Sequence, residues 1–129
     1  TDWKGKKILV AEDDSSNFSL ISEVLKHTDV ELIRARDGKE TLQLYEEHRD
    51  NLHLVLMDIR MPEMNGNDAT QIIRLFNKDI IIIAQTAYAM KSDREISLAS
   101  GFDEHISKPI KKEALMECLD SVLINRGLK

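Results

Sequence analysis

The chain has 129 residues, the length of a single domain, and its 42% hydrophobic and 32% charged residues are typical of a folded globular protein. Its 18 lysines and arginines against 23 aspartates and glutamates give a net charge of -5, which leaves no electrostatic footprint for DNA or RNA. The longest apolar run, residues 80–84, is too short to span a bilayer. We therefore expect no nucleic acid partner and no direct membrane contact.

Short apolar runs alternate along the chain with segments in which apolar residues recur at helical spacing. The runs expected to form strands are residues 7–11, 30–35, 54–57, 80–84 and 104–107. The expected helices follow them, around residues 18–25, 38–45, 69–76, 92–95 and 113–123. Asp37 with Glu40, and Ser92 with Glu95, form capping boxes that open the second and fourth helices. The second strand is less apolar than the others, so we place it nearer an edge.

Strands that alternate with helices and are apolar on both faces predict a parallel sheet covered by helices on each side. Right-handed crossovers leave few topologies, of which the flavodoxin-like order 2-1-3-4-5 is the usual one. We therefore expect one doubly wound α/β domain with a five-stranded parallel sheet, a flavodoxin-like (βα)5 fold. It would cover residues 1–129, with residues 1–6 as a junction from a preceding segment.

A single cysteine, Cys118, excludes an internal disulfide and favours a reducing compartment. It lies among Leu115, Leu119 and Val122 on the last expected helix, so we interpret it as a structural thiol rather than a catalytic one. We expect a cytoplasmic location.

Polar side chains follow the expected strands at the points where the strands end. Glu12 and Asp13 follow the first strand and Asp58 the third, while Thr86 and Lys108 follow the fourth and fifth. The carboxyl ends of parallel strands share one edge of a sheet, so these groups converge there. Crowded carboxylates either take up a proton or admit a cation, and an oxygen-only, half-open site suits Mg²⁺. The hydroxyl of Thr86 and the ammonium of Lys108 suit a phosphoryl group. No serine or cysteine has a base placed beside it, so a carboxylate is left as the nucleophile.

Each of these signals has a plainer interpretation when it stands alone. An acid just after a strand is often a helix N-cap, and we favour that role for Asp14. The segment after Asp58 does not resemble a helix start, so capping explains Asp58 poorly. Lys108 by itself would be an ordinary solvated lysine. Complementary groups at four separate strand ends nevertheless favour one shared site.

Four segments together resemble the receiver domain of two-component response regulators. They are ILVAEDD at residues 8–14, LMDIRMPEMNG at 56–66, TA at 86–87 and KP at 108–109. Each motif alone is weak, but all four in this order and at these spacings are specific. The resemblance covers nearly the whole chain.

The resemblance implies a role for each site residue. Asp58 would accept a phosphoryl group, and Mg²⁺ would be bound by Asp13, Asp58 and the backbone carbonyl of Arg60. Glu12 would act on the metal through water. Lys108 would neutralise the phosphoryl group, and the Lys108-Pro109 bond is a candidate cis peptide. The domain would thus catalyse its own phosphoryl transfer and dephosphorylation.

The resemblance also implies a switch and a control of phosphoryl lifetime. Thr86 would turn to hydrogen-bond the phosphoryl group. His105 stands where the family's switch aromatic usually lies, so a working switch and an ordinary exposed strand histidine both stay open. Arg60 and Tyr88 occupy the positions two beyond the acceptor and two beyond the threonine that tune lifetime in the family. We expect them to slow hydrolysis.

The approach to the first strand, residues 2–7, resembles the junction that precedes receivers fused behind a histidine kinase. We favour the C-terminal receiver of a hybrid histidine kinase, with a stand-alone single-domain response regulator as the alternative. The expected partner is a histidine kinase dimerisation and phosphoacceptor domain or a histidine phosphotransfer domain. An interaction domain that has lost phosphorylation is the main rival, but none of Asp13, Asp58, Thr86 and Lys108 is missing.

Overall fold

The computed structural model describes residues 3–86 and 101–125. The helices and strands are β1 (Lys7–Ala11), α1 (Ser15–Leu25), the 3-10 helix η1 (Lys26–Thr28), β2 (Glu31–Ala35), α2 (Gly38–His48), β3 (Leu54–Asp58), α3 (Gly66–Phe76), β4 (Ile81–Thr86), β5 (Glu104–Ser107) and α5 (Lys112–Asn125). The helix expected around residues 92–95 lies outside the described residues.

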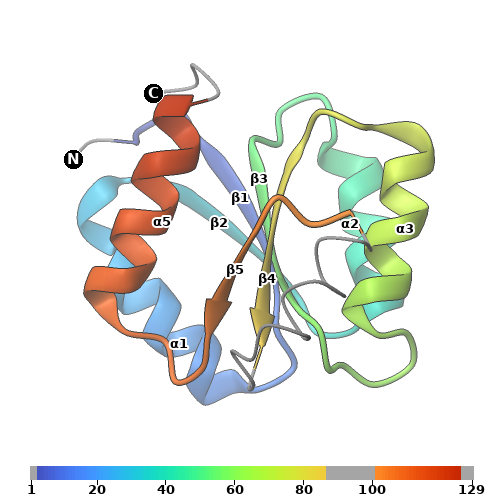
Figure 1. The fold of residues 1–129 in the computed structure, drawn as a ribbon, viewed down its shortest axis with the longest axis horizontal. Helices are drawn as coiled ribbons and strands as arrows, with labels where there is room; N and C mark the ends of the chain where they lie inside the picture. Colours follow the sequence, from blue (N-terminus) through green and yellow to red (C-terminus); the bar gives the residue numbers. More distant parts are fainter. Residues whose placement is uncertain (1–2, 87–100, 126–129) are drawn as a thin grey trace.

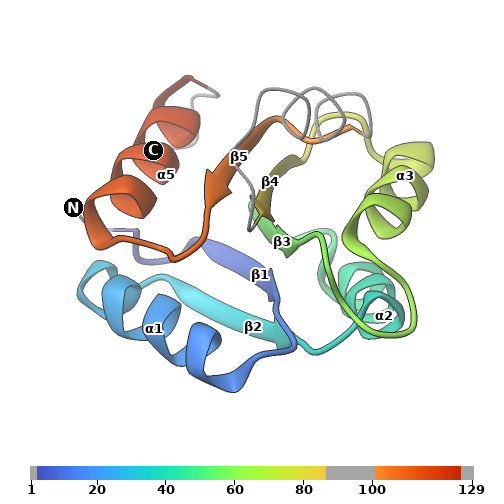
Figure 2. The same ribbon diagram turned by 60° about the horizontal axis from the view of Figure 1, so that its bottom comes forward.

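The five strands form one parallel sheet in the order β2-β1-β3-β4-β5, as the sequence predicts. Helices α1 and α5 cover one face of this sheet, and α2 and α3 cover the other (Figure 1). The three layers are also visible in Figure 2, with β1 and β3 in the middle of the sheet. The less apolar second strand lies at an edge, which confirms its expected place.

Alternate residues of the central strands feed two separate apolar cores. Ile8 and Val10 of β1 point toward α1 and α5, whereas Leu9 and Ala11 point toward α2 and α3. All residues of β3 and β4 are buried. This double burial explains why these strands read as continuous apolar runs rather than as alternating ones.

Local capping fixes where the helices begin. The carboxylate of Asp14 accepts hydrogen bonds from the backbone N–H groups of Ser16 (2.8 Å) and Asn17 (3.2 Å), which confirms Asp14 as the N-cap of α1. Asp37 caps α2 by accepting from the N–H of Glu40 at 2.7 Å. The capping box is modified, because the Glu40 carboxylate accepts from the N–H of the residue before the cap.

Two sequence expectations change at the ends of elements. Strand β4 extends to Thr86 instead of ending at residue 84, because Asp58 pairs with Gln85 and Ser107 with Thr86 in the parallel ladders. Phe76 belongs to the predicted apolar stripe of α3 but is 74% exposed. It lies nearly two turns after buried Ala69, so its exposure comes from its place at the helix end rather than from its direction.

The segment before β1 is tied into the fold from Trp3 onward. Trp3 is 1% exposed and packs with the core between the sheet and helices α1 and α5. Its backbone N–H donates to the carbonyl of Thr28 at 2.6 Å. The N–H of Glu31 donates to the carbonyl of Lys6 at 2.9 Å.

None of the described helices is long and apolar enough to cross a membrane.

His53 joins the starts of β1 and β3 through two hydrogen bonds with Lys7. The backbone N–H of His53 donates to the carbonyl of Lys7 at 2.9 Å, and its ring Nδ1 accepts from the backbone N–H of Lys7 at 3.1 Å. A protonated imidazole could not accept this bond. Burial, followed by the charges of Lys6 and Lys7, lowers the pKa of His53 from its ordinary 6.5.

We expect His53 to make folding stability depend on pH. The pKa of His53 in the folded protein lies below 6.5, so the unfolded chain takes up the proton first as the pH falls. The free energy of unfolding therefore decreases as the pH falls through 6.5. Urea unfolding of wild type and His53→Leu at pH 7.5 and 5.5 measures the effect. The variant should be less stable at pH 7.5, and the difference should narrow at pH 5.5. A difference that is constant or widens would contradict the assignment.

Candidate functional site

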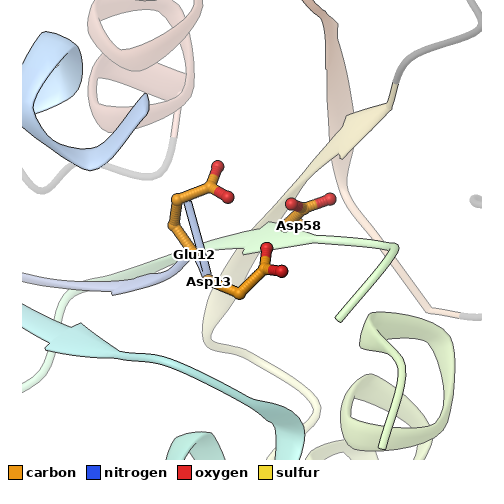
Figure 3. Close-up of side chains that lie close together, drawn as sticks. All are labelled: Glu12, Asp13 and Asp58. Atoms are coloured by element: carbon orange, nitrogen blue, oxygen red, sulfur yellow. The ribbon is translucent and has the colours of Figure 1, made fainter. Parts of the chain in front are cut away.

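The acidic residues that follow β1 lie beside the last residue of β3. Figure 3 shows Glu12, Asp13 and Asp58 directed toward one another from the ends of these two neighbouring strands. One carboxylate oxygen of each lies within 4.8 Å of those of the other two. Glu12 is 0% and Asp58 2% exposed, whereas Asp13 is exposed. The site is therefore closed at its base and open on the side of Asp13.

Lys108 brings the opposite charge to this cluster from the end of β5. Its Nζ lies 2.7 Å from Oδ2 of Asp58 and 3.8 Å from Oε1 of Glu12. Burial acts to lower the pKa of Lys108, but the hydrogen bond and charge of Asp58, with the charges of Glu12 and Asp13, outweigh it and raise the pKa. Lys108 is therefore a fixed positive charge at the site.

The end of β5 is held against the end of β4. The N–H of Lys108 donates to the carbonyl of Thr86 at 2.8 Å, and the Lys108-Pro109 peptide bond is cis, as the sequence predicts. Thr86, 8% exposed, is the last residue of β4. This bond places the threonine and the lysine at the same edge of the sheet as Asp58.

Burial has a large electrostatic effect on Glu12. It raises the pKa of Glu12 to about 7, and the nearby charge of Asp58 acts in the same direction. The side-chain amide of Asn17 and the N–H of Asp14 oppose the rise by donating to the Glu12 carboxylate. Burial and the charge of Asp58 therefore make Glu12 bind a proton more readily than an exposed glutamate does.

The donor set fits Mg²⁺. Among the described residues, the cluster offers only carboxylate oxygens and one open side, and neither sulfur nor imidazole joins it. Mg²⁺ prefers oxygen ligands, keeps several waters and binds phosphate oxygens. Arg60 also borders the site, because its backbone N–H donates to Oδ1 of Asp58 at 3.1 Å. Both carboxylate oxygens of Asp58 thus have hydrogen-bond donors.

His105 is not part of the cluster of Glu12, Asp13 and Asp58, and it is more buried than an ordinary exposed strand histidine. Its side chain on β5 is 13% exposed, and its Nδ1 lies 3.7 Å from Oε1 of Glu104, too long for a hydrogen bond. It borders a cavity of about 390 Å³ with Lys108, Lys111 and Cys118. Tyr88 lies outside the described residues.

Cys118 lies near this cavity as a half-buried thiol. Burial, with the charge of Glu104, raises the pKa of Cys118 to about 11. Because the thiolate is the reactive form, this shift agrees with a structural role for the cysteine.

Sequence reasoning missed three residues that support the site. Asn17 of α1 donates to Oε1 of Glu12 and, at 3.3 Å, to Oε1 of Gln85. Gln85 is fully buried at the end of an otherwise apolar run, and this polar interruption was the signal that could have found it. Arg34 of β2 binds the carbonyls of Glu12 and Asp13.

The fold and the acidic site define a class of protein: a doubly wound flavodoxin-like α/β domain with a carboxylate cluster at the carboxyl ends of β1 and β3. Residues 8–120 match the family model described as "Response regulator receiver domain". The chain therefore belongs to the response regulator receiver family and is a receiver domain of two-component and phosphorelay systems.

Individual relatives of two kinds agree with the family. The chain is 40% identical, over 90% of its length, to "Hybrid signal transduction histidine kinase I" of Dictyostelium discoideum, of which it spans 7%. It is 37% identical, over 92% of its length, to "Polar-differentiation response regulator DivK" of Brucella anthropi, of which it spans 96%. The same domain thus occurs within a long kinase and as nearly a whole protein.

One solved structure of similar fold contains a receiver domain with a partner. It is the co-crystal structure of the Saccharomyces cerevisiae histidine phosphotransfer signaling protein Ypd1 and the receiver domain of its downstream response regulator Ssk1. The match has a TM-score of 0.84 at 26% identity and covers 92% of this chain and 88% of the other.

Gly66, at the start of α3, lets the loop after β3 fold back against Asp58. Its N–H donates to the carbonyl of Ile59 at 2.8 Å, and a Cβ at this position would lie 2.3 Å from the backbone oxygen of Asp58. Real Cβ atoms do not approach a backbone oxygen so closely, so either helix α3 or strand β3 would have to shift.

We expect Gly66→Ala to destabilise the protein. Helix propensity alone would favour alanine by about 1 kcal/mol, whereas overpacking against backbone costs about 1–3 kcal/mol. The sign of the change in the free energy of unfolding, measured in urea, decides which effect is larger. Gln71→Ala, an exposed change on the same helix, is the matched control and should change stability by less than about 0.5 kcal/mol. A Gly66→Ala protein as stable as wild type or more stable would contradict the expectation that overpacking is the larger effect.

Proposed function

We propose that this receiver domain takes a phosphoryl group from a phosphohistidine onto Asp58. The observation that carries the proposal is the 2.7 Å contact between Lys108 Nζ and Asp58 Oδ2 beside two further carboxylates. A buried ion pair alone would need one acid, and here three face one lysine. The surplus negative charge suits a divalent cation and the phosphoryl group that the cation helps to bind.

In this proposal Asp13, Asp58 and the backbone carbonyl of Arg60 would hold Mg²⁺, and Glu12 would act through water. The bound ion would supply positive charge to neutralise the phosphoryl oxygens. The ionised Asp58 needs no general base. One of its oxygens bonds to phosphorus, the phosphorus–nitrogen bond of the donor breaks, and the electron pair returns to the imidazole. Lys108 keeps the product's negative charge paired.

Thr86 and His105 would carry the switch. We infer that the Thr86 hydroxyl turns toward the phosphoryl group, and the bond from Lys108 N–H to the Thr86 carbonyl would pass the movement between β4 and β5. His105, two residues before the end of β5, occupies the side of that strand that borders the cavity near α5. His105 would transmit the movement between β4 and β5 to a partner protein.

Arg60 and Tyr88 would set the lifetime of the phosphoryl group. Hydrolysis needs a water in line with the bond between Asp58 and phosphorus. Arg60 is exposed and its backbone N–H contacts Asp58, and the planar donors of an arginine side chain suit phosphoryl oxygens. Neither side chain offers a carboxylate to orient the water, so we propose a phosphoryl group that persists.

The relatives support two possible places in signalling for this domain. A hybrid histidine kinase is the favoured parent, and the Dictyostelium relative supports it. A stand-alone regulator is the alternative, supported by DivK. The Ypd1–Ssk1 structure supports a histidine phosphotransfer domain as the partner. The phosphoacceptor domain of a histidine kinase is the other proposed partner, and the proposed location is cytoplasmic.

The acceptor assignment is tested by incubating the protein with Mg²⁺ and a small acyl phosphate and measuring intact mass. Wild type should gain one phosphoryl group only when Mg²⁺ is present. Asp58→Asn should gain none, because the amide is a poor nucleophile. Asp50→Asn, a change of an exposed acid that lies before the start of β3, the strand that has Asp58 at its other end, should react like wild type. Labelling of a folded Asp58→Asn protein at the wild-type rate would refute Asp58 as acceptor.

Lys108→Met should move two measurements in opposite directions. Removing a cation that lies 2.7 Å from Asp58 should tighten Mg²⁺ binding, because the acids lose their built-in counter-charge. Phosphorylation should slow by about 10²-fold or more, since the developing negative charge loses its fixed donor. Mg²⁺ binding is followed by NMR titration and phosphorylation by intact mass. Lys111→Met, exposed three residues later, is the control and should alter neither. Unchanged phosphorylation in Lys108→Met would refute the role.

A further inference from the structure

Arg34 connects the edge strand to the backbone of the acidic segment. It lies on β2 opposite Val10 of β1, and its guanidinium reaches past the end of β1. Its Nε donates to the carbonyl of Glu12 at 3.1 Å, and its Nη2 donates to the carbonyl of Asp13 at 3.2 Å. One planar group therefore binds two consecutive carbonyls of the residues whose side chains form the acid cluster.

These carbonyls lie where the backbone ladder between β1 and β2 stops. The last bond between the strands runs from the N–H of Glu12 to the carbonyl of Ala35 at 2.9 Å. After Ala35 the chain leaves the sheet, because Asp37 already caps α2. Beyond this point β2 supplies donors from a side chain, one to the partly buried carbonyl of Glu12 and one to the exposed carbonyl of Asp13. The guanidinium of Arg34 extends the ladder by two carbonyls.

A third element holds the guanidinium in place. The ring of Phe18, on α1, lies with its centroid 5.1 Å from the Cζ of Arg34. A guanidinium stacked on an aromatic face has little freedom to rotate, so its two donors stay directed at the carbonyls. Asn17, the neighbour of Phe18, donates to the Glu12 carboxylate. Helix α1 thus supports both the backbone and the side chain of the acidic segment.

We propose that Arg34 is a positioning residue for the metal site: it fixes the backbone of Glu12 and Asp13 so that both carboxylates face Asp58. This inference rests on the proposed function, since it presumes that the acids bind Mg²⁺. Arg34 acts through the carbonyls and does not touch the reacting atoms. Residues that orient metal ligands typically change metal affinity by 10–100-fold when they are replaced.

The sign of the effect separates positioning from simple electrostatics. Arg34 is a cation close to a site that binds a cation, so its charge alone opposes Mg²⁺ binding. If charge dominated, removing it would tighten binding. If positioning dominates, removing it weakens binding despite the loss of repulsion. A role in stability alone would leave the affinity of the folded protein unchanged.

The experiment titrates MgCl₂ into metal-free protein and follows backbone amide shifts by NMR. The proteins are wild type, Arg34→Met, Arg34→Lys, Asp13→Asn and Arg36→Met. Arg34→Lys keeps the charge but cannot bind both carbonyls with fixed geometry. Arg36→Met removes an exposed cation near the same end of β2 and controls for charge.

We expect Arg34→Met to weaken Mg²⁺ binding by about tenfold, Arg34→Lys to weaken it less, and Arg36→Met to leave it equal or slightly tighter. In metal-free Arg34→Met, the amide of Asp14 should also exchange faster with solvent than in wild type, after correction for global stability. This amide donates to the Glu12 carboxylate at 3.2 Å and reports the conformation of the segment.

The outcomes distinguish the two proposals. Binding in wild type that Asp13→Asn abolishes, with Arg34→Met and Arg34→Lys both as tight as wild type or tighter, would overturn the role of Arg34 and leave the metal site standing. Unchanged amide exchange in both Arg34 variants would also count against it. A wild type that does not bind Mg²⁺ would overturn the proposed function and this inference together.

Discussion

Three carboxylates at the ends of two neighbouring strands repel one another, and the surrounding structure offsets that repulsion. Glu12 and Asp58 are almost fully buried, where charge is most costly. Lys108 supplies one positive charge from β5. The pKa of Glu12 is nevertheless raised, first by burial and then by the charge of Asp58, so the cluster favours either a proton at Glu12 or a further cation.

The fold supports that constraint through its order of strands. Parallel β1 and β3 are neighbours in the middle of the sheet, so their carboxyl ends bring together residues that are 46 positions apart, Glu12 and Asp58. Strand β5 lies two places from β3, and the long side chain of Lys108 covers this distance. The hydrogen bond between Lys108 and Thr86 keeps the lysine at the height of the site. The acids, the hydroxyl and the ammonium thus come from four strand ends of a single sheet.

Strand order and the acidic cluster could be predicted from the sequence because both depend on periodicity and on position along the chain. Apolar runs buried on both faces define β3 and β4, and every chemical group lies at the last residue of its strand or within two residues after it. The misses have a different origin. Arg34, Asn17 and Gln85 act through side chains of separate elements, and no spacing in the sequence links position 17 to position 85. The exposure of Phe76 likewise depends on where α3 ends, which the helical pattern does not encode.

The unequal exposure of the three acids gives the site a direction of entry. Glu12 and Asp58 form its floor, and Asp13 is the one member of the described cluster that meets solvent. Under the proposed function, a small phosphodonor and a phosphohistidine carried on a protein would therefore arrive through the same opening. The acids would not distinguish between them, because both would present the same phosphoryl group to Asp58. Discrimination among partner proteins then belongs to the surface outside this opening, and that surface can diverge between receivers while the floor stays the same.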